Sequence, residues 1–250
     1  DDDAVARLEL NPDRLLPADP GVRPIARELY QAVSELPILS PLSRLSAAWL
    51  AEDRQEADPT AALVTPDESV TGLLLAGGIP PAELGLGDGP LARERSRAAF
   101  RTLCSHCDVL KGTAARLRLE ATLVDVLGID LAPSAETADD LYDAVAARLA
   151  DPALRPQALA DRFRIDFVAT IDDPCDDLAA HTRLAGQDRR TQVVPTFAAD
   201  AYTEPSGHWK DHLQRLADAT GIETDTLSGW VAAMQERRAY FRSRGAVATS

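Results

Sequence analysis

Hydrophobic positions along the chain follow two different periods. Four short, continuously apolar runs are typical of strands buried on both faces: 36–40, 165–171, 191–197 and 245–250. Four longer stretches repeat their apolar residues every three or four positions and predict amphipathic helices: 23–36, 136–150, 208–219 and 225–242. Because the first three apolar runs alternate with helical stretches, the pattern predicts an α/β fold with a parallel sheet.

The helical stretches differ in how clearly they are marked. In 23–36, Ile25, Leu29, Ala32 and Val33 share one face. The stretch 136–150 places apolar residues every fourth position, and Ser134 is its predicted N-cap. Residues 41–164, between the first two predicted strands, are almost wholly helical and too long for a simple connection. They therefore predict a helical insertion or subdomain.

Composition and charge limit the possible partners. The chain has 250 residues, 45% of them hydrophobic and 26% charged, enough for one large domain or two small ones. Its net charge of −14 argues against non-specific binding to nucleic acid or to an anionic membrane. A small anionic substrate stays open, because a local group of arginines can override the net field.

The lack of a recognisable targeting signal and the small number of cysteines both indicate a reducing compartment. No apolar run is long enough to span a bilayer, and the first residues do not form a secretory signal. Three cysteines do not suggest a disulfide scaffold. The sequence therefore predicts a cytoplasmic protein.

The strongest local motif is acidic. Residues 172–177 have the sequence Asp-Asp-Pro-Cys-Asp-Asp, directly after a predicted strand. Carboxylates at the carboxyl end of a parallel strand can supply a general base or hold a cation. Alternatively, Asp173 caps a helix with Pro174 at its first position, and Asp176 and Asp177 favour the positive end of that helix. Both interpretations stay open.

The three cysteines form a second candidate site. Cys104, His106 and Cys107 lie within four positions, and with Cys175 they could form a zinc site or a redox centre. The alternative is that these are ordinary buried cysteines, because no second Cys-x-x-Cys pair is present.

The remaining candidates are basic. His208 and His212 lie on one face of a predicted helix, a spacing that can bind a metal but is equally typical of a solvated helix start. His181 stands alone and is assigned no role. Arg116 and Arg118 could recognise a carboxylate such as that of a sugar acid, or could be surface arginines.

Several ordered segments together resemble the uronate (glucuronate) isomerases, a divergent branch of the amidohydrolase superfamily. The strongest matches are 134–140, 170–178 and 193–197, with weaker ones at 36–41 and 111–116. The resemblance runs over essentially the whole chain. It implies a (β/α)₈ barrel with a large helical insertion after the first strand. The reaction it implies is aldose–ketose isomerisation of a uronate such as D-glucuronate or D-galacturonate.

The resemblance also implies how the chain is divided. Residues 1–44 would hold the N-terminal helix and first barrel strand, 45–162 the helical insertion, and 163–250 the βα units with strands two to four. Four strands leave a barrel open at its edges. We therefore expect an oligomer or a partner segment that completes the barrel, and a sugar acid as the small-molecule partner.

Only some functional residues of the family carry over to this sequence. Asp172 and Asp173 match its acidic catalytic turn, and Arg116 matches its substrate-binding arginine. The family holds a divalent metal such as zinc through a His-x-His motif, and here Leu42 and Arg44 occupy those two histidine positions. Leucine has no donor atom and arginine stays cationic, so we expect no metal cofactor from this chain.

Two further departures concern the same chemistry. Glu68 and Ser69 stand where the family has a His-Tyr pair, and the chain stops at Ser250, where a Ser-Asp-His-Gly motif is expected to begin. We therefore expect that this chain alone does not catalyse the isomerisation. The alternatives are a non-catalytic sugar-acid-binding or structural subunit, and an unrelated zinc or redox protein.

Overall fold

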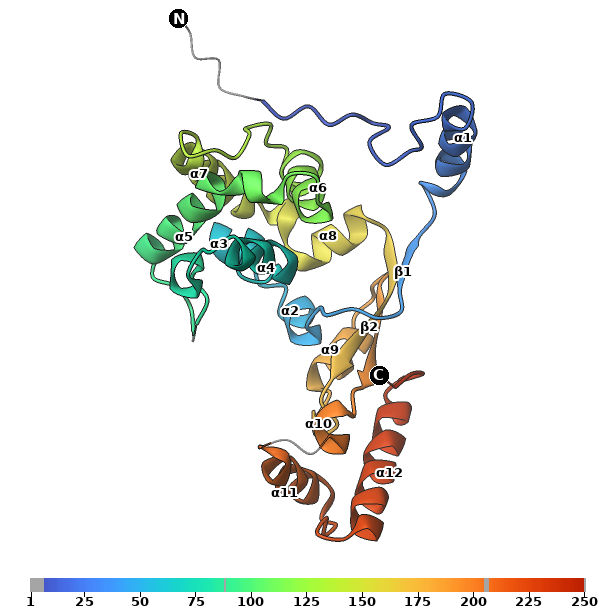
Figure 1. Ribbon diagram of the computed structural model, residues 1–250. Coiled ribbons are helices and arrows are strands. Elements are labelled where there is room, and N and C mark those ends of the chain that lie inside the picture. The colour runs from blue at the N-terminus through green and yellow to red at the C-terminus, as the bar shows by residue number, and fades with distance from the viewer. Residues whose placement is uncertain (1–6, 88, 205–206, 250) are drawn as a thin grey trace, which may run out of the picture. The chain divides into compact units, whose positions relative to one another are not determined.

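The computed structural model describes residues 7–87, 89–204 and 207–249. They form two compact units (Figure 1). The first contains residues 7–35 and 55–155, and the second contains residues 36–54 and 156–249. Each unit is built from two separate stretches of chain, so residues distant in sequence meet within it.

The regular elements of the first unit, within the described part of the chain, are all helices. They are α1 (Arg23–Val33), α3 (Pro59–Leu63), α4 (Glu68–Ala76), η1 (Pro81–Leu84), α5 (Arg93–Ser105), η2 (Cys107–Leu110), α6 (Ala114–Ala121), η3 (Thr122–Val126), α7 (Ala138–Leu149) and η4 (Pro152–Leu154). The packing of α5 on α7 forms its centre, where the rings of Phe100 and Tyr142 meet edge to face at 5.4 Å. A purely helical stretch between the first two strands is what the sequence predicts.

Side-chain caps explain where several of these helices begin. Asp58 accepts hydrogen bonds from the first backbone amides of α3, and Asp67 does the same for α4. Thr113 caps α6 in the same way. The predicted cap of α7 is wrong by three residues, because Thr137 occupies the N-cap position. Ser134 instead exchanges hydrogen bonds with Thr137 in the turn just before it.

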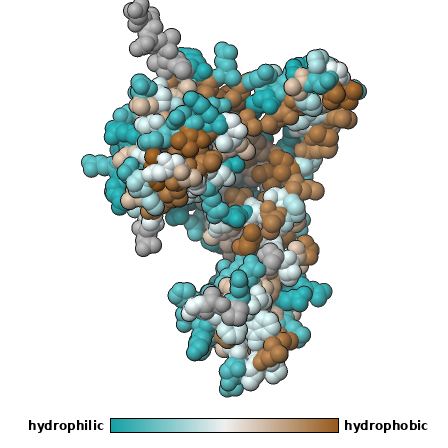
Figure 2. Space-filling view, in the orientation of Figure 1, coloured by the Kyte–Doolittle hydropathy of each residue, from teal (hydrophilic) through white to brown (hydrophobic). Residues whose placement is uncertain are grey.

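Helix α1 leaves its apolar side uncovered. Its apolar residues Ile25, Leu29 and Val33 are 54–65% exposed, and Figure 2 shows this hydrophobic surface. The helix begins at Arg23 as predicted, but it ends at Val33, before the predicted end at residue 36. The apolar pattern therefore predicts the helix correctly, although the structure does not bury the patterned face.

The second unit contains the sheet. Its elements are β1 (Ile38–Ser40), α2 (Ala47–Glu52), α8 (Pro156–Arg162), β2 (Ile165–Asp172), α9 (Ala179–Ala185), β3 (Gln192–Phe197), α10 (Asp200–Thr203), α11 (Trp209–Thr220) and α12 (Leu227–Ser243). The strands are parallel in the order β1-β2-β3, which confirms the predicted α/β class. Val168 pairs with Ser40 on one side and with Val193 on the other, so β2 is the central strand.

The predicted fourth strand over 245–250 is wrong for the described residues. Thr249 forms an isolated parallel bridge to Phe197, and residues 245–248 are not part of a strand. Ser250 lies outside the described residues. Gly245 has φ +95, which turns the chain sharply from the end of α12 back toward β3.

Helix α12 covers the end of β3. Phe197 and Phe241 are both fully buried and meet edge to face at 5.1 Å, within a cluster that includes Leu178, Tyr202 and Met234. This cluster fixes the segment after β2 and the segment after β3 against one helix. The carboxyl ends of both strands are therefore held by apolar packing. None of the helices in the described ranges is long and apolar enough to cross a membrane.

Candidate functional site

The acidic turn at the end of β2 is built from its own side chains. Asp173, Asp176 and Asp177 each accept a hydrogen bond from the backbone amide two residues further on, at 2.6–2.9 Å. Such Asx turns hold a loop without any ligand. Three of the four carboxylates in the predicted site therefore have a local structural role.

Helix α12 fixes the backbone of this turn from outside. The guanidinium of Arg237, itself 7% exposed, donates to the carbonyls of Pro174 at 2.6 Å and Asp176 at 2.8 Å. The hydroxyl of Tyr240 donates to the carbonyl of Asp177 at 2.6 Å. These bonds satisfy carbonyls that belong to no helix or strand, so α12 determines the shape of the turn.

The helix that follows starts later than the sequence suggests. Asp173 is not an N-cap and Pro174 is not a first helical residue, because α9 begins at Ala179. The residue before it, Leu178, has φ 52 and is fully buried. A left-handed leucine is unfavourable by itself, and the apolar cluster around its side chain compensates for it. The capping interpretation is therefore wrong, although the turn is still structural.

Asp172 lies in a buried polar group with Thr170 and His181. The Thr170 hydroxyl is 2.7 Å from Asp172 Oδ2 and 2.8 Å from His181 Nε2, and the carboxylate and imidazole are 3.6 Å apart. A hydroxyl carries one proton, so if Thr170 donates to Asp172 it must accept from His181. The neutral imidazole then carries its proton on Nε2, and Nδ1 is a buried atom without a hydrogen-bond partner.

Burial shifts both titrating groups toward their neutral forms. Desolvation raises the pKa of Asp172, against the lowering effect of the Thr170 hydrogen bond. Desolvation also lowers the pKa of His181, although the nearby carboxylate favours the charged imidazole. The Asp172 side chain is 11% exposed and the His181 side chain 4%. A carboxyl group with a raised pKa can accept and return a proton closer to neutral pH than an ordinary aspartate can.

Asp173 is the more accessible of the two predicted catalytic residues. Its side chain is 36% exposed, and Oδ1 accepts from the Tyr202 hydroxyl at 2.8 Å. Arg215 of α11 lies 3.3 Å from the same oxygen. Tyr202 also lies 3.1 Å from the sulfur of Cys175, whose pKa is raised by burial. Asp173 therefore connects the turn to α10 and α11.

Arg116 belongs to the first unit and has partners there. Its side chain is 19% exposed and pairs with Glu120 at 2.5 Å. It also donates to the sulfur of Cys107 at 2.7 Å. Arg118, the neighbouring candidate, forms a bidentate ion pair with Asp67. Both arginines therefore already pair with carboxylates of this chain.

The residues at the expected metal positions do not fit a metal ion. Leu42 is 60% exposed and follows β1, and Arg44 lies two residues further on. Neither offers a neutral or anionic donor atom. Within 7–87, 89–204 and 207–249, no group of three or more His, Cys, Asp or Glu side chains is arranged to hold a metal ion.

In the part of the chain that the structure describes, the cysteines, His208 and His212 do not form a group that could hold a metal ion. Burial raises the pKa of Cys104 to about 12, and it raises the pKa of Cys107 as well, so both are thiols at neutral pH. Cys104 and Cys107 lie in the first unit and Cys175 in the second. His208 is 85% exposed beside Asp211, and His212 packs against the ring of Tyr202. The burial of Cys104 and Cys107 fits the interpretation that they are ordinary buried cysteines.

Sequence reasoning missed four residues that shape the site: Thr170, His181, Tyr202 and Arg237. The sequence gives only a weak indication of a role for His181, which is the third residue of the helix after the acidic turn. Arg237 has none, because 61 positions separate it from the nearer of the carbonyls it holds.

The comparisons with known proteins are consistent with one another. The sequence model of a family described as glucuronate isomerase matches residues 22–250. A uronate isomerase of Cutibacterium acnes is 45% identical over 244 residues, covering 97% of this chain and 52% of that protein. A uronate isomerase of Rhizobium meliloti is 39% identical, covering 96% of this chain and 52% of that protein. The chain therefore spans about half the length of the curated relatives it matches.

Solved structures agree on the fold. The crystal structure of glucuronate isomerase from Caulobacter crescentus matches with a TM-score of 0.91 at 29% identity, over 97% of this chain and 51% of that one. The uronate isomerase structure from Thermotoga maritima matches with a TM-score of 0.85 at 21% identity, over the same shares. At that lower identity the similarity concerns the fold alone.

Proposed function

The chain belongs to the glucuronate isomerase family, and from this premise we propose that it acts in the aldose–ketose isomerisation of a uronate. The observation that carries the proposal is the family match over residues 22–250. Relatives named uronate isomerase support it. The substrate class is a sugar acid such as D-glucuronate or D-galacturonate, and the reaction moves a proton between C1 and C2 of the open-chain sugar.

We assign the functional residues through the family resemblance. Asp172 and Asp173 are proposed to handle the proton, and Arg116 is proposed to bind the substrate carboxylate. The raised pKa of Asp172 and the accessibility of Asp173 support the first assignment. The partial exposure of Arg116 leaves room for the second, although a substrate must compete with Glu120.

The metal-dependent part of the reaction is proposed to be changed. Leu42 and Arg44 occupy the two positions at which the family resemblance places metal-binding histidines. A bound metal supplies Lewis-acid activation, worth several kcal/mol of transition-state stabilisation. We therefore expect no turnover by the 250-residue chain alone.

The architecture is proposed to be part of a (β/α)₈ barrel that another segment or a second copy completes. The exposed edge strand supports this, since Ile38 and Leu39 of β1 are 47% and 66% exposed. The domain division at 44 and 162 and a cytoplasmic setting complete the proposal. Three free cysteines support a reducing compartment.

The test is a paired binding and turnover assay. The purified chain is titrated with D-glucuronate, and formation of D-fructuronate is followed by NMR with and without added Zn²⁺ or Mn²⁺. We expect binding without turnover, while the Cutibacterium acnes relative serves as the active control. Absence of binding to both D-glucuronate and D-galacturonate would contradict the substrate class. Turnover by the unmodified chain would contradict only the changed metal chemistry, and the Leu42→His/Arg44→His double variant tests whether those two positions account for it.

A further inference from the structure

One threonine hydroxyl on β2 lies within hydrogen-bond distance of three different groups. Thr170 Oγ1 is 2.7 Å from Asp172 Oδ2, 2.8 Å from His181 Nε2 and 3.3 Å from the carbonyl oxygen of Val194. The strand β2, the helix α9 and the strand β3 each supply one of these partners. Because Thr170 is fully buried, its hydroxyl has to find its hydrogen bonds within this group.

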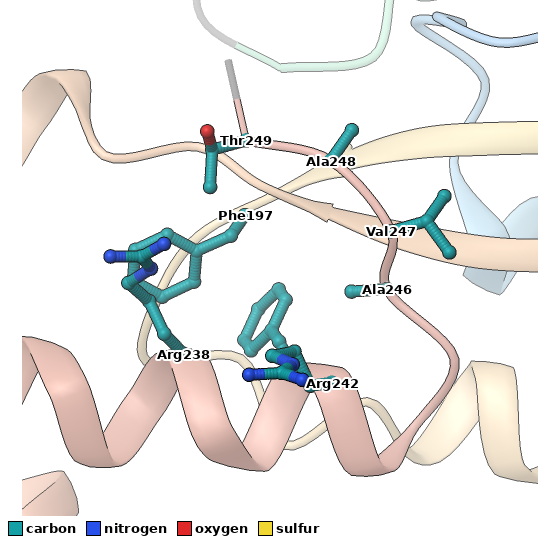
Figure 3. A pocket seen from close by; sticks show the side chains of 8 residues that line it. Phe197, Arg238, Arg242, Ala246, Val247, Ala248 and Thr249 are labelled. Carbon is teal, nitrogen blue, oxygen red and sulfur yellow. The ribbon is translucent and has the colours of Figure 1, made fainter.

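The sheet and its covering helices hold these atoms in place. Thr170 and Asp172 lie on the same side of β2, since they are two positions apart on one strand. In register, Thr170 pairs with Pro195 and Asp172 with Phe197 of β3. Phe197 lies against α12 (Figure 3), and α9 packs on β3. The three distances therefore follow from the packing of the second unit.

The three partners differ in what they offer to the hydroxyl, which has one proton to donate and two lone pairs. The Val194 carbonyl only accepts, and the Asp172 carboxyl accepts when ionised but donates when protonated. With Asp172 ionised, Thr170 donates to it and accepts from His181. With Asp172 protonated, Thr170 accepts from both Asp172 and His181 and donates to Val194. The hydroxyl thus has a donor role and an acceptor role in each state.

The tautomer of His181 follows from the same arrangement. Its Nδ1 is buried and has no hydrogen-bond partner in the described part of the chain, so no other contact selects the tautomer. If Nδ1 carried the proton, Thr170 would donate to Nε2, and its oxygen would lie 2.7 Å from an ionised Asp172 with no proton between them. With the proton on Nε2, the imidazole instead holds the threonine oxygen while the hydroxyl proton turns.

We propose that Thr170 and His181 are positioning residues for Asp172, and that the Thr170 hydroxyl turns from Asp172 to Val194 when the carboxyl group gains a proton. The proton-handling role of Asp172 rests on the proposed function, whereas this hydroxyl switch rests on the geometry of the group. The proton that Asp172 gains comes from its reaction partner or from water and leaves the same way, so Thr170 and His181 neither gain nor lose one. Asp172 can thus change charge without moving its oxygen atoms.

The other charged groups close to the pair have partners elsewhere. Asp176 favours the protonated form of both Asp172 and His181, and its carboxylate accepts from a backbone amide of the acidic turn. On α12, Arg237 donates to carbonyls of the turn and Arg244 to a hydroxyl of α9. In the described chain, neither guanidinium is hydrogen-bonded to Asp172 or to His181. The Thr170 hydroxyl is the hydrogen-bond partner that Asp172 and His181 share.

NMR of the full 250-residue chain without substrate tests the switch directly. We expect the ring nitrogens of His181 to show a neutral imidazole with its proton on Nε2 at neutral pH. Nε2 should stay protonated while the carboxyl carbon of Asp172 reports the titration of that group. His181→Gln identifies the histidine signals. A proton on Nδ1 alone at neutral pH, or loss of the Nε2 proton as Asp172 titrates, would overturn the proposal.

Substitutions at Thr170 separate its hydroxyl from its shape. Thr170→Val removes the hydrogen bond that lowers the pKa of Asp172, so we expect that pKa to rise by about one unit or more. Thr170→Ser keeps a hydroxyl and should restore the titration of the unmodified chain. Thr196→Val is the matched control, because Thr196 is a buried β3 threonine whose hydroxyl has no partner in the described ranges. It should leave the pKa of Asp172 unchanged.

The outcomes distinguish the switch from the proposed function. The same pKa of Asp172 in Thr170→Val and Thr196→Val would overturn the switch, and so would a serine variant that titrates like the valine variant. Circular dichroism checks that each variant is folded; if Thr170→Val is not, the histidine NMR of the unmodified chain decides. None of these measurements needs a substrate. An intact switch in a chain that binds neither D-glucuronate nor D-galacturonate would contradict the proposed function alone.

Discussion

Replacing Arg237 by methionine should destabilise the second unit selectively. Arg237 donates two hydrogen bonds to carbonyls of the acidic turn, and its guanidinium lies 4.3 Å from the Tyr240 ring centroid. Methionine keeps most of the buried volume and removes both donors. A hydrogen bond from a charged group contributes about 1.5–3 kcal/mol net. The carbonyl of exposed Asp176 can be hydrated after the change, which reduces the loss, so we expect about 3 kcal/mol.

Tryptophan fluorescence during urea unfolding measures this loss in the correct unit. Trp49, Trp209 and Trp230 all lie in the second unit. With an m-value of about 3 kcal/mol/M, a loss of 3 kcal/mol lowers the unfolding midpoint by about 1 M urea. Arg238→Met changes the exposed neighbouring arginine and should stay within about 0.5 kcal/mol of the unmodified chain. If Arg237→Met unfolds at the same urea concentration as Arg238→Met, the turn does not depend on α12 and the reasoning is refuted.

The remaining predictions concern single side chains. Burial lowers the pKa of His181, so the unfolded chain binds more protons than the folded chain as pH falls below about 6.5, and the free energy of unfolding should decrease there. His181→Gln should reduce this pH dependence when urea unfolding is measured at several pH values, and an unchanged dependence would exclude His181 as its source. Cys104 is 2% exposed and burial raises its pKa to about 12, so its thiol should not react with a thiol reagent until the first unit unfolds. Labelling is mapped by mass spectrometry, and rapid labelling of Cys104 in the native chain would contradict this prediction. Gly229→Ala places a Cβ 1.9 Å from the carbonyl oxygen of Glu223 and should lower the free energy of unfolding by about 2 kcal/mol or more. Gly72→Ala, in helix α4, meets no atom within 4 Å and should raise the free energy of unfolding by about 0.5–1 kcal/mol. A change of the same sign for both variants in thermal unfolding would refute the comparison.

Element types follow from local sequence more reliably than element ends do. The predicted strands at 165–171 and 191–197 match β2 and β3 to within one residue, because an apolar run between polar turns depends on few distant contacts. The predicted strand at 245–250 has the same composition, but only Thr249 pairs, with Phe197. A strand needs a partner along its whole length, and sequence alone does not supply one.

The candidate site was predictable in part. The position of the acidic turn after β2 follows from the apolar run before it, and Asx turns are within reach of local reasoning. The Thr170–Asp172–His181 group was not predicted, since it requires α9 to fold back over β2 and bring His181 to the strand. The engagement of Arg116 by Glu120 is an ordinary i,i+4 pair that the spacing already allows.

By itself, the sequence determined the alternation of strands and helices, the helical stretch after the first strand, and the presence of Leu42 and Arg44 where histidines were expected. These depend on residue identity and on periods of two to four positions. Only the tertiary structure decided which patterned faces are buried, and it left Ile25 and Leu29 of α1 exposed. It also decided that Arg237 holds the acidic turn while its neighbour Arg238 is exposed. Burial and long-range hydrogen bonds depend on what each side chain meets in three dimensions, and adjacent positions on one helix can therefore have opposite roles.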